Sequence, residues 1–349
     1  MTRISMIEAI ASAVQEEMRR DDRVFLMGED VRYGIYGGKG LVEEFGEERV
    51  RNTPISEAGF LGAGVGAAIT GMRPVVDMTI SVFLYSAMDP LISQAAKNRY
   101  MFGGQASLPI VIRSSLFYGA GQAAHHSDRP YPLFMNTPGL KIIVPSTSYD
   151  AKGLLKSAIR TDDPVLSFED VTLWGTRSEV PDEEYVIPLG VADIKRAGTD
   201  VTIVAIAGSV PHALAAAKTL AEEQISVEVI DPRSLVPLDY DTIMSSVART
   251  GRLVVADPAH RTCGAAGEIA ATVTEELFWD LQAPVVRVTT PDVQIPFSPA
   301  LERQLFPTTE KIISAVRKVL EPHAPRNTAR SSDGQGEATV SAVSDSAQG

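Results

Sequence analysis

One carboxylate in this sequence is set apart by the residues around it. Glu57 follows the turn-like run Thr53–Ser56 and begins a segment of small and apolar residues that extends to Gly71. A carboxylate in the first turn of a helix is favoured by the helix dipole. A carboxylate held in an apolar pocket has a raised pKa instead, and it can share a proton with a nitrogen atom of a ligand. The residues alone leave both interpretations of Glu57 open.

A second set of candidate residues lies in the loop from Gly119 to Asp128, which contains His125 and His126. This loop follows an expected strand at Ile110–Arg113, and ligands of open α/β sheets usually bind at the carboxyl ends of strands. Adjacent histidines rarely point the same way, and no third His, Cys or paired acid lies nearby. The pattern therefore favours an acid, base or electrophile over a metal ligand.

The glycines between residues 59 and 71 do not predict a dinucleotide site. Gly62, Gly64 and Gly66 lack the final glycine of the nucleotide fingerprint, and the preceding residues are turn-like where a strand should enter. Close packing of a helix explains these small residues better.

Expected strands and helices alternate along the chain, which predicts an α/β fold with parallel sheets covered on both faces. The expected strands are short β-branched runs at 24–27, 75–78, 110–113, 142–144, 201–207, 227–230, 253–256 and 285–288. The expected helices lie at 4–19, 56–70, 88–100, 148–159, 210–224, 267–277 and 310–320. Acidic residues and proline interrupt the alternation near 171–190, which predicts a boundary between two domains.

Composition excludes several classes of protein. The 349 residues carry a formal net charge of −12 without a cluster of Lys and Arg, which argues against nucleic-acid binding. The apolar runs are too short to span a membrane, and the first twenty residues do not form a signal peptide. Cys263 is the single cysteine, so a reducing, cytoplasmic location is expected.

Taken together, these residues resemble the β subunit of the thiamine-diphosphate-dependent decarboxylase component of 2-oxo acid dehydrogenase complexes. The pyruvate, branched-chain and acetoin types share the pattern, and the resemblance covers roughly residues 3–321. The matching motifs occur in the order Gly28–Val31, Thr53–Glu57, Asp89–Tyr100, His126–Ser127, Pro138–Lys141, Asp150–Leu154, Asp231–Arg233, Pro237–Asp239 and Gly267–Ala270.

The resemblance implies two doubly wound α/β domains of the transketolase group. Residues 1–170 would form the pyrimidine-binding domain, 171–189 a linker, 190–321 a transketolase C-terminal-like domain, and 322–349 a disordered tail. In the family an α subunit holds the diphosphate through Mg²⁺ with a Gly-Asp-Gly motif, and this sequence contains no Gly-Asp-Gly. The resemblance thus implies an α₂β₂ heterotetramer with a shared coenzyme.

The resemblance also implies roles for particular residues. Glu57 matches the glutamate that activates the aminopyrimidine of thiamine diphosphate, and Phe83 matches the ring that packs on it. Glu29 is assigned to the same coenzyme, and His126 faces the substrate or the acyl-transfer step. A potassium-like ion is expected mainly on backbone carbonyls, at the positions Ile110, Ala158, Ile159, Thr161 and Asp163.

The implied reaction is oxidative decarboxylation of a 2-oxo acid, with acyl transfer to a lipoyl acyltransferase. An acetoin-cleaving enzyme and a non-catalytic assembly subunit are the alternatives, and a nicotinamide-dependent oxidoreductase is disfavoured by the glycine spacing. The sequence departs from its relatives on the substrate side. Asp128 stands where they commonly have Gln, Ser114 where they often have Gly, and Asn136 where they commonly have His.

Overall fold

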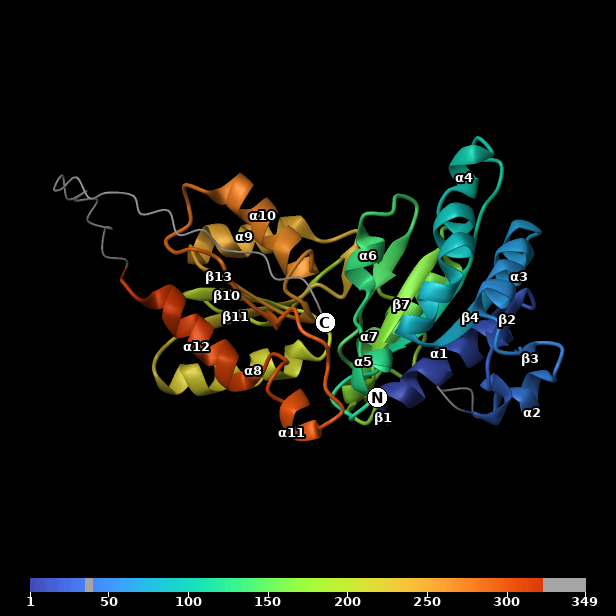
Figure 1. Ribbon diagram of the computed structural model, residues 1–349, viewed down its shortest axis with the longest axis horizontal. Helices are drawn as coiled ribbons and strands as arrows, with labels where there is room; N and C mark the ends of the chain where they lie inside the picture. The colour runs from blue at the N-terminus through green and yellow to red at the C-terminus, as the bar shows by residue number, and fades with distance from the viewer. Residues whose placement is uncertain (35–39, 323–349) are drawn as a thin grey trace, which may run out of the picture.

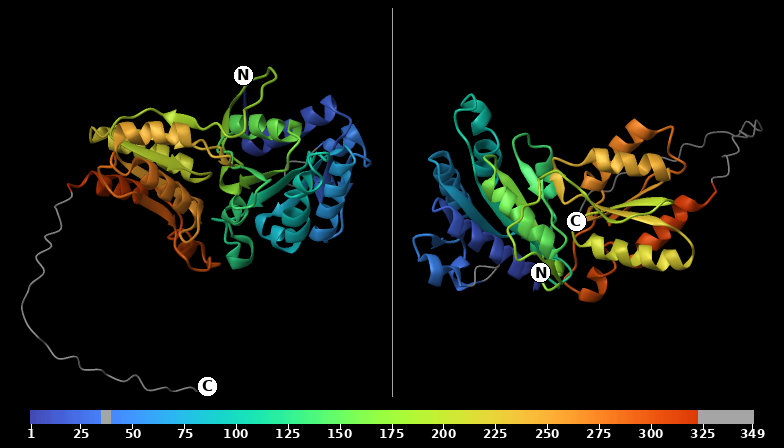
Figure 2. Two further views of the ribbon diagram at one scale, coloured as in Figure 1. Left: turned by 90° about the horizontal axis from the view of Figure 1, so that it is seen from above. Right: turned by 180° about the vertical axis from the view of Figure 1, so that it is seen from behind.

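The computed structural model describes residues 1–34 and 40–322, which form two α/β domains lying side by side (Figure 1, Figure 2). Each domain has a central sheet with helices on both faces, so the predicted doubly wound architecture is confirmed. The tail, predicted to be disordered, falls outside the described residues beyond 322.

The sheet of the N-terminal domain has seven strands. In spatial order they are β12 (Ser234–Val236), β6 (Lys141–Ile143), β7 (Val165–Asp170), β5 (Val111–Leu116), β4 (Arg73–Ile80), β2 (Val24–Gly28) and β3 (Val50–Asn52). All are parallel except β12, which pairs antiparallel with β6. Strands β2 and β5 are buried along their whole length, as is typical of parallel strands covered on both faces.

Two helix layers cover this sheet. Helices α1 (Met6–Arg20) and α7 (Ser148–Arg160) pack on one face. Helix α3 (Glu57–Ile69) and the π-helix η4 (Asp89–Ala95) pack on the other, and η4 continues towards the short α4 (Asn98–Met101). Helix α1 begins at a capping box, in which the Ser5 and Glu8 side chains each accept a hydrogen bond from the other residue's backbone N–H.

The C-terminal domain has a five-stranded sheet. Its strands, in spatial order, are β14 (Val286–Thr290), β13 (Leu253–His260), β10 (Val201–Ala205), β11 (Val227–Asp231) and the antiparallel β9 (Asp193–Arg196). Helices α8 (Ser209–Glu222) and α12 (Thr309–Leu320) cover one face, and α9 (Tyr240–Thr250) and α10 (Ala265–Leu277) cover the other (Figure 1).

The remaining elements are short. They are β1 (Thr2–Ser5), which pairs with β8 (Arg177–Val180), and η1 (Val31–Tyr33), α2 (Leu41–Phe45), η3 (Ser81–Ala87), α5 (Ala123–His126), α6 (Tyr131–Met135), η5 (Val171–Leu173) and α11 (Pro299–Glu302).

The structure contains elements that were not expected, among them β7, β9 and α9, and it differs from the prediction in three further places. The predicted linker contains a strand, β8, which reaches back to β1 at the start of the chain. The expected helix at 88–100 is a π-helix followed by a separate turn of α-helix. Strand β12 comes from the second half of the chain and extends the sheet of the first domain. One apolar cluster also runs through both domains, so they share a packed interface.

Candidate functional site

The four residues predicted to serve the coenzyme or substrate all follow strands of the N-terminal sheet. Glu29 directly follows β2, and Glu57 follows β3. Phe83 lies in η3, after β4, and His126 ends α5, after β5. Since β3, β2, β4 and β5 are parallel neighbours in this order, their carboxyl ends meet at one edge of the sheet. Ligands of open α/β sheets bind at that edge.

The structure brings Phe83 and His126 into contact, although they lie 43 positions apart in the sequence. Their ring centroids lie 5.8 Å apart with an angle of 86° between the rings, an edge-to-face arrangement. His125 is exposed, whereas His126 is partly buried. The His126 Nδ1 atom is buried and has no hydrogen-bond partner among the described residues, so it is a polar atom that a ligand could satisfy.

Glu29 and Glu57 form a pair of acids at the same edge. Burial raises the pKa of Glu29, and the negative charges of Glu57, Asp30 and Asp77 raise this pKa further. The Glu29 Oε1 atom is buried and unpartnered within the described part of the chain. A raised pKa keeps the carboxyl protonated to a higher pH than usual, which suits a site that shares a proton with a ligand nitrogen. Buried, unpartnered oxygens here fit the polar pyrimidine that the resemblance implies.

Glu57 itself is less buried than a carboxylate held in an apolar pocket would be. It is the first residue of α3, and its side chain is partly exposed. The preceding residues Pro54, Ile55 and Ser56 are exposed, and Ile55 reaches 84% exposure. The edge is held in place by the Thr53 backbone N–H, which donates to the Gly28 carbonyl at 3.0 Å. The chain by itself therefore leaves Glu57 at an open rim.

A buried ion-pair cluster lies within the sheet that carries this edge. The Arg113 guanidinium on β5 donates two hydrogen bonds of 2.8 Å to Glu169 on β7. It also contacts Asp77 on β4 at 3.2 Å. Burial raises the pKa of Asp77 to about 6, although the Arg113 charge opposes this. One cation thus faces two acids, and the cluster cross-links three strands, of which β4 and β5 are followed by site residues.

The carbonyl groups predicted to hold a potassium-like ion already have protein partners in part. The Arg73 Nη1 donates to the carbonyls of Ile159 and Thr161 at 3.0 and 2.9 Å. The Ile110 carbonyl accepts the Val165 N–H at 3.0 Å. Each carbonyl oxygen retains a second lone pair, so the geometry fits an ion only in part.

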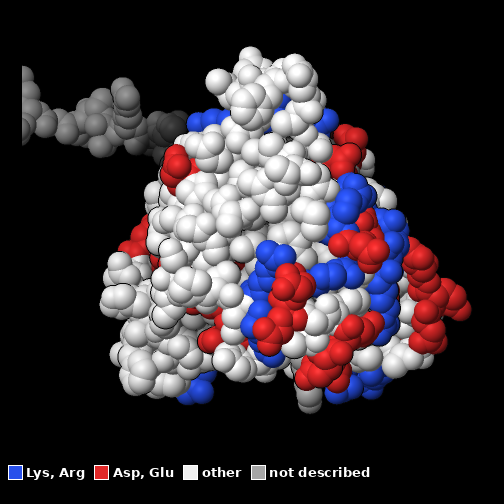
Figure 3. Space-filling model, turned by 90° about the vertical axis from the view of Figure 1, so that its right-hand side faces the viewer, with Lys and Arg blue, Asp and Glu red and all other residues white. Residues whose placement is uncertain are grey.

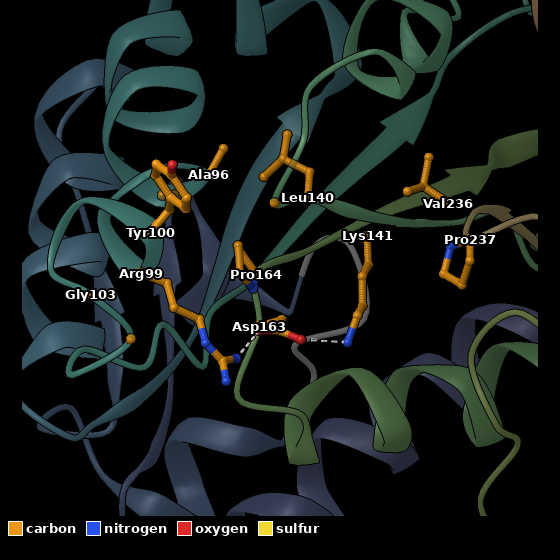
Figure 4. A pocket seen from close by; sticks show the side chains of 13 residues that line it. Ala96, Arg99, Tyr100, Gly103, Leu140, Lys141, Asp163, Pro164, Val236 and Pro237 are labelled. Carbon is orange, nitrogen blue, oxygen red and sulfur yellow. Dashed lines mark hydrogen bonds and ion pairs between the residues drawn. The ribbon is translucent and has the colours of Figure 1, made fainter.

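Asp163, another predicted ion ligand, lies in a different setting. Its carboxylate is paired with Arg99 on one side and with Lys141 at 2.7 Å on the other (Figure 4). Both ion pairs border a pocket of about 810 Å³ between α4, Leu140 and Pro237. The two cations lower the pKa of Asp163 against the effect of its partial burial. None of the residues predicted to bind the coenzyme lines this pocket.

The loop around His126 is fixed by residues that sequence reasoning did not identify. The Asp128 carboxylate accepts the Tyr85 hydroxyl at 2.9 Å, and the Asp128 carbonyl accepts the Ser81 hydroxyl at 2.9 Å. Both donors belong to η3, the element that carries Phe83. From the C-terminal domain, Glu302 binds the same loop. The only sequence signal was the departure from the family pattern at Asp128.

Two absences hold for the part of the chain that the structure describes. Residues 1–34 and 40–322 contain no group of three or more His, Cys, Asp or Glu side chains placed to hold a metal ion. None of the helices in these ranges combines the length and apolar character that crossing a membrane requires.

The two α/β domains are those of a transketolase-like protein. The family model for the transketolase pyrimidine-binding domain matches residues 2–173, and that for the transketolase C-terminal domain matches residues 190–312. The chain belongs to the family of β subunits of thiamine-diphosphate-dependent 2-oxo acid and acetoin dehydrogenases.

Individual relatives are similar along nearly their whole length. The beta subunit of the acetoin:2,6-dichlorophenolindophenol oxidoreductase of Bacillus subtilis is 48% identical, over 91% of this chain and 97% of the relative. The beta subunit of the 2-oxoisovalerate dehydrogenase of the same species is 41% identical, over 92% of this chain and 100% of the relative. Among solved structures, a split-gene transketolase described as an inactive beta4 tetramer has a TM-score of 0.74 at 25% identity, covering 91% of this chain and 98% of the other.

Proposed function

We propose that this chain is the coenzyme-activating half of a thiamine-diphosphate-dependent dehydrogenase that decarboxylates a 2-oxo acid. The observation that carries the proposal is the meeting of Glu57, Glu29, Phe83 and His126 at one sheet edge in a member of this family. When bound, thiamine diphosphate would supply a nucleophilic thiazolium carbon. The protein contributes the proton, the orientation and the exclusion of water.

Each residue has a defined task in this proposal. Glu57, at the rim of the sheet, shares a proton with the pyrimidine nitrogen, and the negative charge of Glu57 raises the pKa of the neighbouring Glu29. Phe83 packs against the pyrimidine. The imidazole of His126 offers its unpartnered Nδ1 to the substrate or to the acyl group as it leaves for a lipoyl acyltransferase.

The site requires an α subunit, which would carry the Gly-Asp-Gly motif and the Mg²⁺ that hold the diphosphate. Two observations support such a partner in an α₂β₂ assembly. Glu57 is partly exposed in this chain, and α3 presents a surface of small uncharged residues, with Ala58, Gly59, Ala63 and Gly66 exposed. Figure 3 shows a broad uncharged area on the side of the molecule where α3 lies. Exposed uncharged surfaces of this kind mark protein interfaces.

Acetoin is the second candidate substrate. A relative at 48% identity is named for acetoin, whereas one named for 2-oxoisovalerate is 41% identical. The substrate side of the site, at Asp128 and Asn136, departs from the family pattern. Both substrates undergo carbon–carbon bond cleavage at a carbonyl group, so the same proton chemistry at Glu57 serves either of them. The potassium-like ion and the cytoplasmic location stay as proposals from the sequence.

The test is reconstitution with the α subunit. The purified pair is assayed with pyruvate, branched-chain 2-oxo acids and acetoin, using an artificial electron acceptor. We expect coenzyme binding and turnover only when both subunits and Mg²⁺ are present. Tight coenzyme binding and turnover by this chain alone would show that the site is not shared.

A further inference from the structure

We infer that Glu302, in the C-terminal domain, is a positioning residue that holds the loop carrying His126. Glu302 ends α11, and its side chain is fully buried. Its two carboxylate oxygens accept the backbone N–H groups of Gly119 at 2.7 Å and Gly121 at 2.9 Å. A side chain of the C-terminal domain thus accepts hydrogen bonds from two backbone N–H groups in the His126 loop of the N-terminal domain.

The conformation of the loop explains why it needs such an acceptor. Gly119 and Gly121 have φ angles of 76° and 69°, in the left-handed region that glycine adopts readily. Backbone N–H groups in such turns can form a concavity that binds an anion. The loop also lies close to the segment before α11, since a Cβ atom on Gly121 would lie 3.3 Å from the Phe297 carbonyl oxygen.

The other end of the loop is fixed to the same domain. Arg129 is buried, and its Nε donates to the Pro258 carbonyl at 2.8 Å in β13. Its Nη1 donates to the Ser127 carbonyl, one residue beyond His126. The C-terminal domain therefore anchors the loop on both sides of the histidine.

The histidine depends on these anchors because little else holds its ring. The Nδ1 atom of His126 has no hydrogen-bond partner in the described part of the chain, and its ring makes an edge-to-face contact with Phe83. The ring is therefore placed by the backbone of its loop. A displacement of about 1 Å in a catalytic group can cost about 100-fold in rate. Glu302 thus acts through His126, without touching the substrate.

This inference rests on the proposed function for its effect on the rate, and on the geometry alone for its effect on the loop. The variant is Glu302→Gln in the reconstituted α–β complex, since glutamine keeps the size but turns one acceptor into a donor facing an N–H group. The matched control is Asp231→Asn. Asp231 is equally buried at the domain boundary, where it accepts hydrogen bonds from Ser146 and from the Arg233 N–H, and none of its hydrogen bonds reaches the His126 loop.

Two measurements test the inference. Hydrogen–deuterium exchange of the peptide containing Gly119 to Ser127 should be faster in Glu302→Gln than in the wild type, and unchanged in Asp231→Asn. In the activity arm, kcat/KM should fall by roughly 10–100-fold while proton exchange at the thiazolium carbon, which Glu57 serves, stays close to that of the wild type. On a His126→Ala background, Glu302→Gln should cause little further loss, since both changes affect one step.

The outcomes separate the two claims. Unchanged loop exchange in Glu302→Gln, or a full additional loss on the His126→Ala background, would overturn the inference. An inactive wild-type pair with every substrate would instead overturn the proposed function, and loop exchange would still decide whether Glu302 is the anchor. Thermal midpoints of both carboxylate variants show how much of any loss is general destabilisation.

Discussion

Glu57→Gln in the α–β complex separates the two interpretations of this carboxylate. Glutamine has the same shape and can still accept a hydrogen bond, but it cannot hold and release a proton at neutral pH. If Glu57 were only a favourable charge at the start of α3, its loss would affect folding and leave the chemistry intact. If Glu57 is the acid of the site, its substitution should lower the rate of coenzyme activation.

The structure sets the size of both effects. Glu57 is partly exposed at the first position of α3, so the free energy of unfolding should fall by about 0.3–1 kcal/mol in Glu57→Gln. Proton transfer by a positioned group contributes about 10²–10⁴-fold in rate, or about 3–5 kcal/mol of transition-state stabilisation. The predicted loss of activity is therefore far larger than the loss of stability.

The assay follows two steps in the same preparation. Deuterium exchange at the thiazolium carbon reports activation of the coenzyme, and reduction of an artificial electron acceptor reports the complete turnover. Glu310→Gln is the matched control because Glu310 also lies in the first turn of a helix, α12, and is remote in sequence from the site. Glu57→Gln should abolish most of the exchange, whereas Glu310→Gln should retain it.

The reasoning is refuted if Glu57→Gln exchanges the thiazolium proton at the wild-type rate. It is also refuted if the activity lost in Glu57→Gln is matched by Glu310→Gln, because the effect would then come from helix stability. A large fall in thermal midpoint in Glu57→Gln alone would show that the carboxylate has a structural partner in the complex.

Three further predictions concern the scaffold. Asp77 has a folded pKa of about 6 against an ordinary 3.8, so its stabilising contribution is present below pH 3.8 and lost as the pH rises through 6. This contribution of Asp77 to the free energy of unfolding is about 3 kcal/mol. Asp77→Asn should therefore flatten the dependence of that free energy on pH between pH 4 and 6 in urea unfolding, and an unchanged slope would contradict the prediction. Gly139→Ala should lower the free energy of unfolding by about 3 kcal/mol or more in thermal unfolding. The φ of Gly139 is 100°, and a Cβ atom there would lie 2.0 Å from the Ala96 carbonyl oxygen. Gly40→Ala is the control for backbone strain alone, because Gly40 has a φ of 82° and open space around its Cβ position. If the predicted carbonyl site binds an ion, potassium should raise the thermal midpoint above that in choline at equal ionic strength, and equal midpoints would argue against the site.

The sequence predicted most of the sheet because buried parallel strands leave continuous apolar runs. Strand β7 was missed for the opposite reason. Its sequence Val-Leu-Ser-Phe-Glu-Asp is half polar, and Glu169 and Asp170 are buried with partners from Arg113 and Tyr118. A local pattern cannot show that a buried acid will be paired, because the partner lies more than fifty positions away.

The same limit applies to the site. Glu57 and His126 stand out in the sequence because motifs surround them, whereas Phe83 was assigned only through the resemblance to the family, and the roles of all three remain predictions. Glu302 carried no signal, since it lies 183 positions from Gly119 and only the packing of the two domains brings them together. The sequence of β12 likewise gave no indication that it would extend the sheet of the other domain, because strand pairing across domains depends on the tertiary fold.

The open rim at Glu57 follows from what the complete site must do. Two adjacent acids in a dry pocket would be costly for a free subunit, since desolvation disfavours charged carboxylates. Here one acid, Glu29, is partly buried with a raised pKa, and the other remains at a rim that water can reach. Covering the rim with a second subunit would remove that water and make it more costly for both carboxylates to be charged. Proton chemistry would then begin only in the assembled enzyme, where a coenzyme and substrate can use it.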